Sequence, residues 1–162
     1  ASITKPAEPT RTGYTFAGWS PTPASSMPAE NVTYTALWTA NTNTPYVVEH
    51  YQQNLDLSYP TTPTEKESFT GTTDTKVTPT VKTYEGFTSP ATQEVTIAAD
   101  GSLVVRYEYK RNSYELTWEL NGGNITTAGT AAGSVLFGAE IKVPGCRLRR
   151  PGKHHGPRCH DR

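Results

Sequence analysis

Hydrophobic and polar side chains alternate in short runs along most of the 162-residue chain, and turn-favouring residues separate the runs. A two-residue period places the hydrophobic side chains of an extended segment on one face, so each run predicts a β-strand. A sustained helical period is almost absent. The pattern therefore predicts a mainly β fold, organised in three blocks.

The first block, residues 1–40, contains two predicted strands. Tyr14 and Phe16 share one face of the first strand, and Trp38 ends the hydrophobic face of the second. Two strands with one aromatic face make only half of a core, and such a unit is marginally stable in water. This block is therefore incomplete by itself.

A polar linker, residues 41–44, precedes the second block, residues 45–112. Asp100-Gly101 predicts a type I′ turn in this block, because both residue types tolerate positive φ. The block has enough strands to form a complete small domain. Its predicted elements are strands at 46–51 and 65–69, a tight bend at 84–88, and a hairpin formed by 93–97 and 102–109.

The third block, residues 113–144, begins with a predicted strand at 114–120 that carries Trp118 on its hydrophobic face. Asn121-Gly122 follows, and Asn-Gly is the strongest hairpin signal in the sequence. A returning strand is predicted at 139–143.

Composition and charge narrow the function classes. Only 34% of the residues are hydrophobic, against roughly 45–50% in ordinary domains on a count that includes glycine, so any core is thin. Residues 145–162 hold six of the 15 basic and one of the 15 acidic residues, which leaves nine basic and fourteen acidic residues in 1–144. This mildly acidic body predicts no nucleic-acid partner. The sequence contains no run of about 18 apolar residues, which is the length needed to span a bilayer, so we expect no membrane insertion within this chain.

Two motifs point to a known family. The first block contains Gly13-Tyr14-Thr15-Phe16-Ala17-Gly18-Trp19 and ends on Trp38, and the third block contains a strand followed by Asn121-Gly122-Gly123. Together these blocks resemble the Listeria-Bacteroides repeat, also called the internalin B-repeat. The order is inverted, because residues 113–144 supply the start of such a repeat and residues 1–40 its end. The resemblance implies two complementary half-repeats that flank the central block.

The central block resembles the MucBP-like modules of Gram-positive surface proteins, on the strength of its first strand, the bend Tyr84-Glu85-Gly86-Phe87 and the closing strand at 104–109. Both families are associated with ubiquitin-like β-grasp folds, which implies small α+β modules in tandem. The resemblance also implies a stalk or adhesin region of a bacterial protein that is secreted or attached to the cell wall. A host glycan or a host protein is the implied partner.

Residues 1–144 contain few candidates for chemistry. His50 alternates with Val47 and Tyr51, so we expect it on the solvent face or in a cross-strand contact. Glu65 and Glu67 share a face, which usually means a solvated surface rather than paired catalytic acids. A nucleophile elbow, a phosphate loop and a metal-ligand cluster are all missing from residues 1–144. We therefore expect no enzyme activity and no cofactor.

The aromatic residues allow two interpretations. Exposed Tyr and Trp faces can stack on sugars, which favours a glycan- or mucin-binding module. The positions of Tyr14, Phe16, Trp19, Trp38 and Trp118 in the motifs favour core packing instead. Half-repeats also expose strand edges and a bare aromatic face, so we predict head-to-tail association through them.

The basic tail, residues 145–162, departs from the pattern of the repeats. Its cysteine and histidine side chains are possible zinc ligands, but their spacing fits no standard finger and the flanks are rich in arginine. We expect the tail to be disordered or out of frame, with no metal bound. The residues concerned are Cys146, His154, His155, Cys159 and His160.

Overall fold

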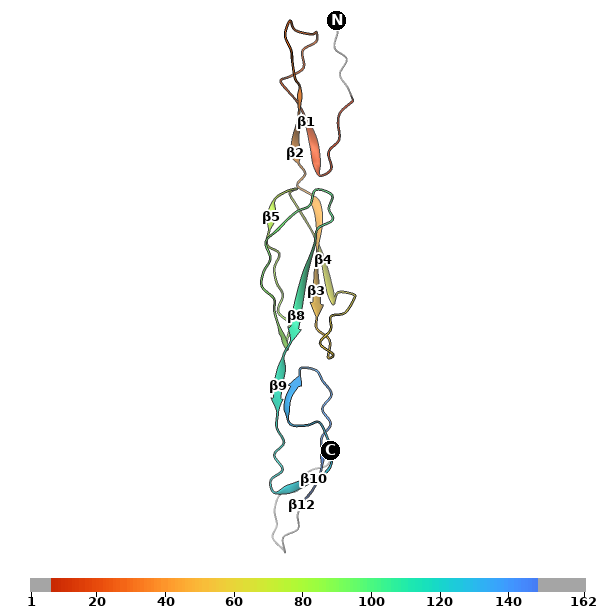
Figure 1. The fold of residues 1–162 in the computed structure, drawn as a ribbon, viewed down its shortest axis with the longest axis vertical. Helices are drawn as coiled ribbons and strands as arrows, with labels where there is room; N and C mark the ends of the chain where they lie inside the picture. The colour runs from red at the N-terminus through yellow and green to blue at the C-terminus, as the bar shows by residue number, and fades with distance from the viewer. Residues whose placement is uncertain (1–6, 149–162) are drawn as a thin grey trace.

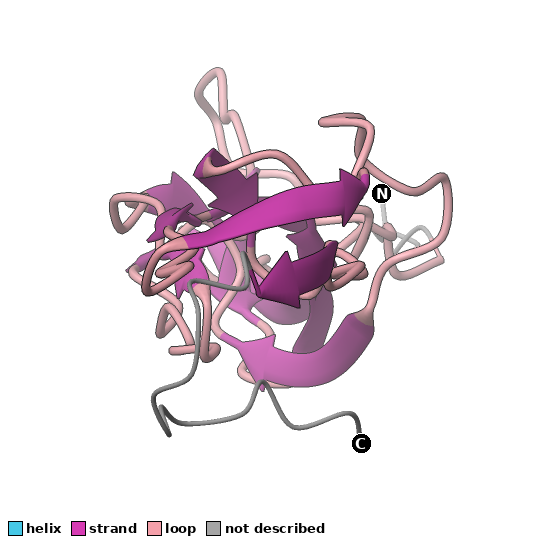
Figure 2. Ribbon diagram, turned by 90° about the horizontal axis from the view of Figure 1, so that it is seen from below, coloured by secondary structure: helices cyan, strands magenta, loops and turns pink. Residues whose placement is uncertain are grey.

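A computed structural model of the protein describes residues 7–148, and within this range the backbone forms twelve β-strands and no helix. The expectation of a mainly β fold is confirmed, whereas the α part of the expected α+β fold is wrong for this range. Figure 2 accordingly shows only strands and loops. Figure 1 shows the strands grouped in three modules along the long axis: an N-terminal module (residues 7–40), a central module (44–111) and a C-terminal module (113–148).

The N-terminal module consists of two antiparallel strands, β1 (Tyr14–Ser20) and β2 (Thr35–Ala40). Phe16 lies opposite Trp38, and a β-bulge follows it before Gly18. The ring of Phe16 meets the rings of Trp19 and Trp38 edge-on, with centroids 5.5 Å and 5.6 Å away. All three side chains stay half-buried, because no second layer covers them.

The central module contains a four-stranded sheet in the order β4-β3-β8-β6. Its first strand, β3 (Thr44–Gln52), pairs antiparallel with β4 (Glu65–Gly71) and parallel with β8 (Val104–Arg111). The short strand β6 (Phe87–Thr88) pairs antiparallel with the other edge of β8. The first and last long strands of the module therefore lie side by side in the middle of the sheet.

Two further short strands, β5 (Lys76–Val77) and β7 (Val95–Thr96), form a separate antiparallel pair. The predicted hairpin between 93–97 and 102–109 is therefore wrong, because β8 has β3 and β6 as its neighbours. The predicted type I′ turn is wrong as well. Gly101 has a φ of 74° but Asp100 is not in the positive-φ region, and the turn runs from Ala98 O to Gly101 N at 2.9 Å.

The core of the protein lies between the sheet and the connection from β4 to β8. Pro79 and Pro90 interrupt that connection, and proline removes a backbone donor that a helix requires. Within the described range, every buried hydrophobic side chain other than proline belongs to the central module. These side chains are Tyr46, Val48, Tyr51, Ile97, Val105, Tyr107 and Tyr109.

The C-terminal module contains two pairs of strands. The strand β9 (Ser113–Leu116) pairs with β11 (Gly133–Leu136), and β10 (Gly123–Thr127) pairs with β12 (Gly145–Leu148). The Asn121-Gly122 turn forms, with φ values of 45° and 83° and a 2.8 Å hydrogen bond from Gly123 N to Leu120 O. The predicted hairpin is wrong, because β9 and β10 pair with β11 and β12 instead of with each other.

Three further predictions for this region differ from the structure. The first strand ends at Leu116 rather than at 120, and residues 139–143 form no strand. The expected disorder of the tail from residue 145 is wrong for its first four residues, because their backbone pairs with β10. Strand pairing, rather than the local alternation of side chains, decides which segments become strands here.

Candidate functional site

The most unusual polar residue of the described range is His50, in the middle of β3. Its side chain is fully buried, so the predicted solvent-face position is wrong. The alternation that decides the face is Tyr46, Val48 and His50, all of which point into the core. Tyr51 is buried on the opposite face of the strand, because the guanidinium of Arg106 covers its ring 3.7 Å from the centroid. The parity of Tyr51 therefore does not indicate which face of the strand points into the core.

Both ring nitrogens of His50 are hydrogen-bonded. Nε2 lies 3.0 Å from Glu67 Oε2, and Nδ1 lies 2.8 Å from the hydroxyl of Tyr109. An ionised carboxylate only accepts, so Nε2 carries the proton and a neutral ring accepts at Nδ1. The Tyr109 hydroxyl then donates to His50 and accepts from the backbone N of Lys82 at 2.9 Å.

Lys82 continues this network toward the surface. Its ammonium forms an ion pair with Glu67 at 3.0 Å and a second one with Glu65. The hydroxyl of Tyr84 donates to the other oxygen of Glu65 at 2.7 Å. The hydrogen bonds of Lys82 hold the pKa of both carboxyl groups below its usual value, and the two carboxylates raise the pKa of Lys82.

The tyrosines of the network titrate above their usual range. Burial is the main cause that raises the pKa of Tyr84, and its hydrogen bond to Glu65 adds to the effect. Burial also raises the pKa of Tyr109. The rings of these two residues pack edge-to-face with centroids 4.7 Å apart. Both phenols therefore stay neutral donors at physiological pH.

The strand register explains why these side chains meet. His50 lies opposite Glu65 on β4 and beside Tyr107 on β8, while Lys82 comes from the connection that covers the sheet. The cross-strand role expected for His50 is thus present, together with its burial. Glu65 and Glu67 both form ion pairs with the ammonium of Lys82, so they do more than form a solvated face.

The chemistry of the network points to support of the fold. Within residues 7–148, every buried side-chain nitrogen or oxygen has a hydrogen-bond partner, so His50 has no vacant lone pair facing a substrate. In the same range, no group of three or more His, Cys, Asp or Glu side chains is placed to hold a metal ion. The possible zinc ligands of the tail, apart from the backbone of Cys146, lie outside the described residues.

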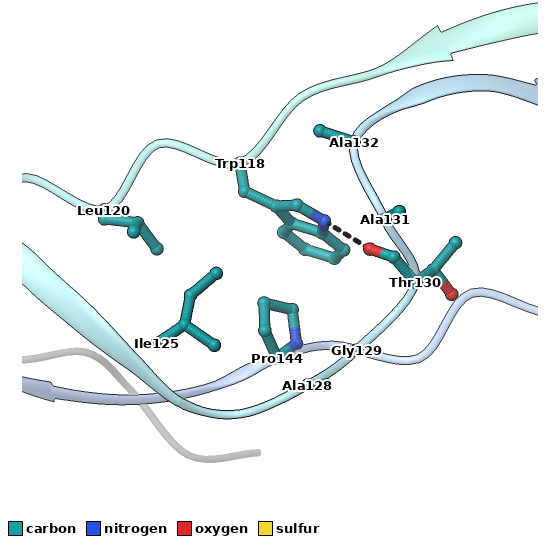
Figure 3. A pocket seen from close by; sticks show the side chains of 9 residues that line it. All are labelled: Trp118, Leu120, Ile125, Ala128, Gly129, Thr130, Ala131, Ala132 and Pro144. Carbon is teal, nitrogen blue, oxygen red and sulfur yellow. Dashed lines mark hydrogen bonds between the residues drawn. The ribbon is translucent and has the colours of Figure 1, made fainter.

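A hollow in the C-terminal module is the second candidate site (Figure 3). It encloses about 400 Å³ and is mostly apolar. The indole of Trp118 forms one wall, and its Nε1 donates to Thr130 O at 2.8 Å. Trp118 is half-buried and Ile125 is 51% exposed. The other lining residues are Leu120, Ala128, Gly129, Thr130, Ala131, Ala132 and Pro144.

The motif residues predicted from the sequence divide between turns and partly packed faces. Gly13 and Gly86 each take a positive φ in a tight turn just before a strand, and Asn121-Gly122 forms a tight turn between β9 and β10, which do not pair with each other. Gly18 lies at the bulge of β1. Phe16 packs against Trp19 and Trp38 without any of the three becoming buried, and Phe87 packs against the core of the central module. Sequence reasoning missed Lys82, which no short motif marks, and it placed Tyr109 in the closing strand without its hydrogen bond to His50.

Comparison with known proteins bears on the first block. Residues 1–45 match the model of the Listeria-Bacteroides repeat domain, which confirms the resemblance stated for that block and suggests a repeat region of a surface protein. The resemblances of the central and third blocks stay predictions. No match was found among curated proteins or among solved structures. Residues 7–148 include no helix that is long and apolar enough to cross a membrane.

Proposed function

We propose that the chain is a non-catalytic repeat region of a bacterial protein that is secreted or attached to the cell wall, where it forms part of a stalk or adhesin. The observation that carries this proposal is the end-to-end order of three small β modules (Figure 1) in a chain whose first 45 residues match a surface-protein repeat. Small modules arranged end to end form a long molecule even though each module has only a small hydrophobic core. The closed hydrogen-bond network around His50 supports a structural role over a catalytic one.

We also propose a β-grasp relationship and a MucBP-like identity for the central module. The parallel pairing of its first and last long strands in the middle of the sheet, with β4 and β6 at the edges, supports the β-grasp topology. The bend before Phe87 supports the MucBP-like pattern, because Phe87 N bonds to Tyr84 O at 3.2 Å. The β5–β7 pair takes the place that a β-grasp helix would occupy.

A glycan- or mucin-binding module is the alternative function. Tyr114 is 55% exposed and Phe69 is 41% exposed, so both rings are accessible to a sugar. A glycan array and a mucin pull-down of the intact chain separate the two functions. The stalk proposal predicts no saturable binding. Saturable binding that is lost in Tyr114→Ala or Phe69→Ala would overturn it in favour of the alternative.

The half-packed terminal modules support head-to-tail self-association as a further part of the proposal. The two modules lie at opposite ends of the chain (Figure 1), so neither completes the other within one molecule. Light scattering at rising concentration tests this association. We expect a mass above that of the monomer for the parent protein. The variant Ile125→Glu places a charge in the hollow beside Trp118, so we expect it to have the mass of the monomer. A constant monomer mass would contradict it.

A further inference from the structure

Two asparagines occupy equivalent places between the modules. Asn41 lies between the end of β2 and the start of β3, and Asn112 lies between the end of β8 and the start of β9. Both side chains are half-buried. The two surroundings share their hydrogen bonds, their glycine and their stacked arginine.

At the first junction, Asn41 binds both neighbouring modules. Its backbone N donates to Gly13 O at 2.9 Å, and its side-chain oxygen accepts from the hydroxyl of Thr15 at 2.7 Å. Both partners belong to the N-terminal module. The carbonyl of Asn41 accepts from the backbone N of Thr73 in the central module, at 2.9 Å.

At the second junction, Asn112 makes the same set of bonds. Its backbone N donates to Gly86 O at 2.9 Å, and its side-chain oxygen accepts from the hydroxyl of Thr88 at 2.6 Å. The carbonyl of Asn112 accepts from the backbone N of Phe137 in the C-terminal module, at 2.8 Å. Each asparagine thus joins a turn of the preceding module to a loop of the following one.

The two turns are also alike. Gly13 and Gly86 have φ values of 77° and 76°, and each precedes the aromatic residue that starts a strand. The following module packs directly on each glycine. A Cβ on Gly13 would lie 2.6 Å from Ala99 O, and a Cβ on Gly86 would collide with the ring of Phe137. Only glycine satisfies both the backbone angle and the close approach.

An arginine covers the aromatic ring of each turn. The guanidinium of Arg11 lies 3.8 Å from the centroid of Tyr14, and that of Arg111 lies 4.7 Å from the centroid of Phe87. Contacts then cross each junction. The hydroxyl of Tyr14 donates to Asp74, while Arg111 Nη1 donates to the carbonyl of the residue that packs on Gly86, at 2.8 Å.

We propose that these are two copies of one joint, in which a Gly-aromatic-Thr turn and a following asparagine form a docking site for the next module of the same chain. The joint fixes each module on its neighbour, because three hydrogen bonds and a close-packed glycine act at one point. A tandem array built on this joint is a stiff rod rather than a series of modules connected by flexible linkers. This inference rests on the proposed stalk function for its biological meaning, but its test is independent.

Spin labels in adjacent modules measure the joint directly. Cysteines placed at the exposed positions Thr33, Thr70 and Ser134 label the three modules pairwise, after Cys146 and Cys159 are replaced by serine. Pulsed dipolar spectroscopy then gives the distribution of distances between each pair of labels. We expect one narrow distribution for each pair in the parent protein.

Substitution of each asparagine should loosen only its own joint. Asn112→Ala is expected to broaden the distribution across the second joint and leave the first unchanged, and Asn41→Ala is expected to do the reverse. The matched controls Asn43→Ala and Asn124→Ala change exposed asparagines that make no side-chain hydrogen bond within residues 7–148. Broad distributions in the parent, or no broadening in either joint variant, would overturn the inference.

Milder substitutions test the joint even if the alanine variants fail to fold. Thr15→Val and Thr88→Val remove one hydroxyl each from exposed strand positions. We expect amide hydrogen exchange at Thr73 in the first variant, and at Phe137 in the second, to rise by roughly 3–10-fold. Unchanged exchange at both amides would contradict the joint. Glycan binding by the intact chain would contradict the stalk function while leaving this result untouched.

Discussion

The central module and the two terminal modules are built from similar strands, but they bury them to different extents. In the central module, Tyr107 and Tyr109 are fully buried. In the terminal modules, the aromatic faces are half-buried, and Leu37 and Ile125 are 44% and 51% exposed. The alternation of side chains is as regular at the ends as in the middle. The number of paired strands, together with the covering connection, therefore decides where a core forms.

This difference predicts unequal stability along the chain. Burial of apolar surface contributes about 25 cal/mol per Å², so the module with the closed core holds most of the stability. The terminal modules add two-stranded sheets that depend on their docking to the centre. All three tryptophans, Trp19, Trp38 and Trp118, lie in the terminal modules. Tryptophan fluorescence therefore reports on the ends, and hydrogen exchange reports on each module separately.

The largest effect is expected for Tyr107→Ala. This change removes a fully buried ring and its 2.8 Å hydrogen bond to Pro79 O, and loss of a buried aromatic ring costs about 3–5 kcal/mol. Urea unfolding should shift to lower concentration by fluorescence and by circular dichroism, because the ends lose their support. The matched change Trp38→Ala should leave hydrogen exchange in the central module unchanged. Parent-like unfolding of Tyr107→Ala would show that the core of the central module does not hold most of the stability.

A smaller effect is expected for His50→Phe. Phenylalanine fills the same space but leaves Glu67 and the Tyr109 hydroxyl without their buried partner, which lowers the free energy of unfolding by about 1–3 kcal/mol. Urea unfolding of His50→Phe, Tyr109→Phe and the double variant measures the coupling between the two side chains. We expect a coupling energy of about 0.5–3 kcal/mol. Additive effects would argue against a network.

The acidic groups of the network should make stability depend on pH. The pKa values of Glu65 and Glu67 are lowered in the folded state, first of all by Lys82. Their stabilising contribution is therefore present above the unfolded pKa of about 4.3, and it is lost as pH falls through the folded pKa. Thermal midpoints at pH 7 and pH 3 test this. The fall in midpoint should be smaller in Lys82→Met than in the parent, and an equal fall would contradict the assignment.

The smallest effect is expected for Trp118→Phe. The indole N–H of Trp118 donates to Thr130 O at 2.8 Å, and a neutral hydrogen bond contributes about 0.5–1.5 kcal/mol. Hydrogen exchange should rise within the C-terminal module and stay unchanged in the central one. Trp19→Phe is the matched control, because its indole nitrogen makes no hydrogen bond in the described range. A rise in hydrogen exchange that spreads into the central module would contradict the separate stability of the two modules.

Much of the fold could be predicted from local sequence. Alternation predicts β3, the first strand of the central module, and the strand near residue 65. Residues that tolerate positive φ predict the bend at Gly86 and the Asn121-Gly122 turn. Pairing could not be predicted in the same way. The partners of β7 and β8 depend on contacts between distant segments, so the nearest turn signal gave the wrong hairpin.

The site was less predictable than the fold. The face of His50 was misassigned because an arginine covers Tyr51 from outside, and side-chain parity cannot show such a cover. Lys82 lies more than thirty residues along the chain from His50, in a segment without alternation. The joints were visible in part, since Gly13-Tyr14-Thr15 and Gly86-Phe87-Thr88 repeat one pattern, but the role of Asn41 and Asn112 required the structure.

Small-angle X-ray scattering of the intact chain measures whether the three modules lie end to end. A compact chain of this length has a radius of gyration of about 15 Å. Three modules held end to end by stiff joints predict a clearly larger radius and an asymmetric distance distribution with a long tail. A symmetric distribution with a radius near the compact value would show that the modules pack against one another instead of lying end to end.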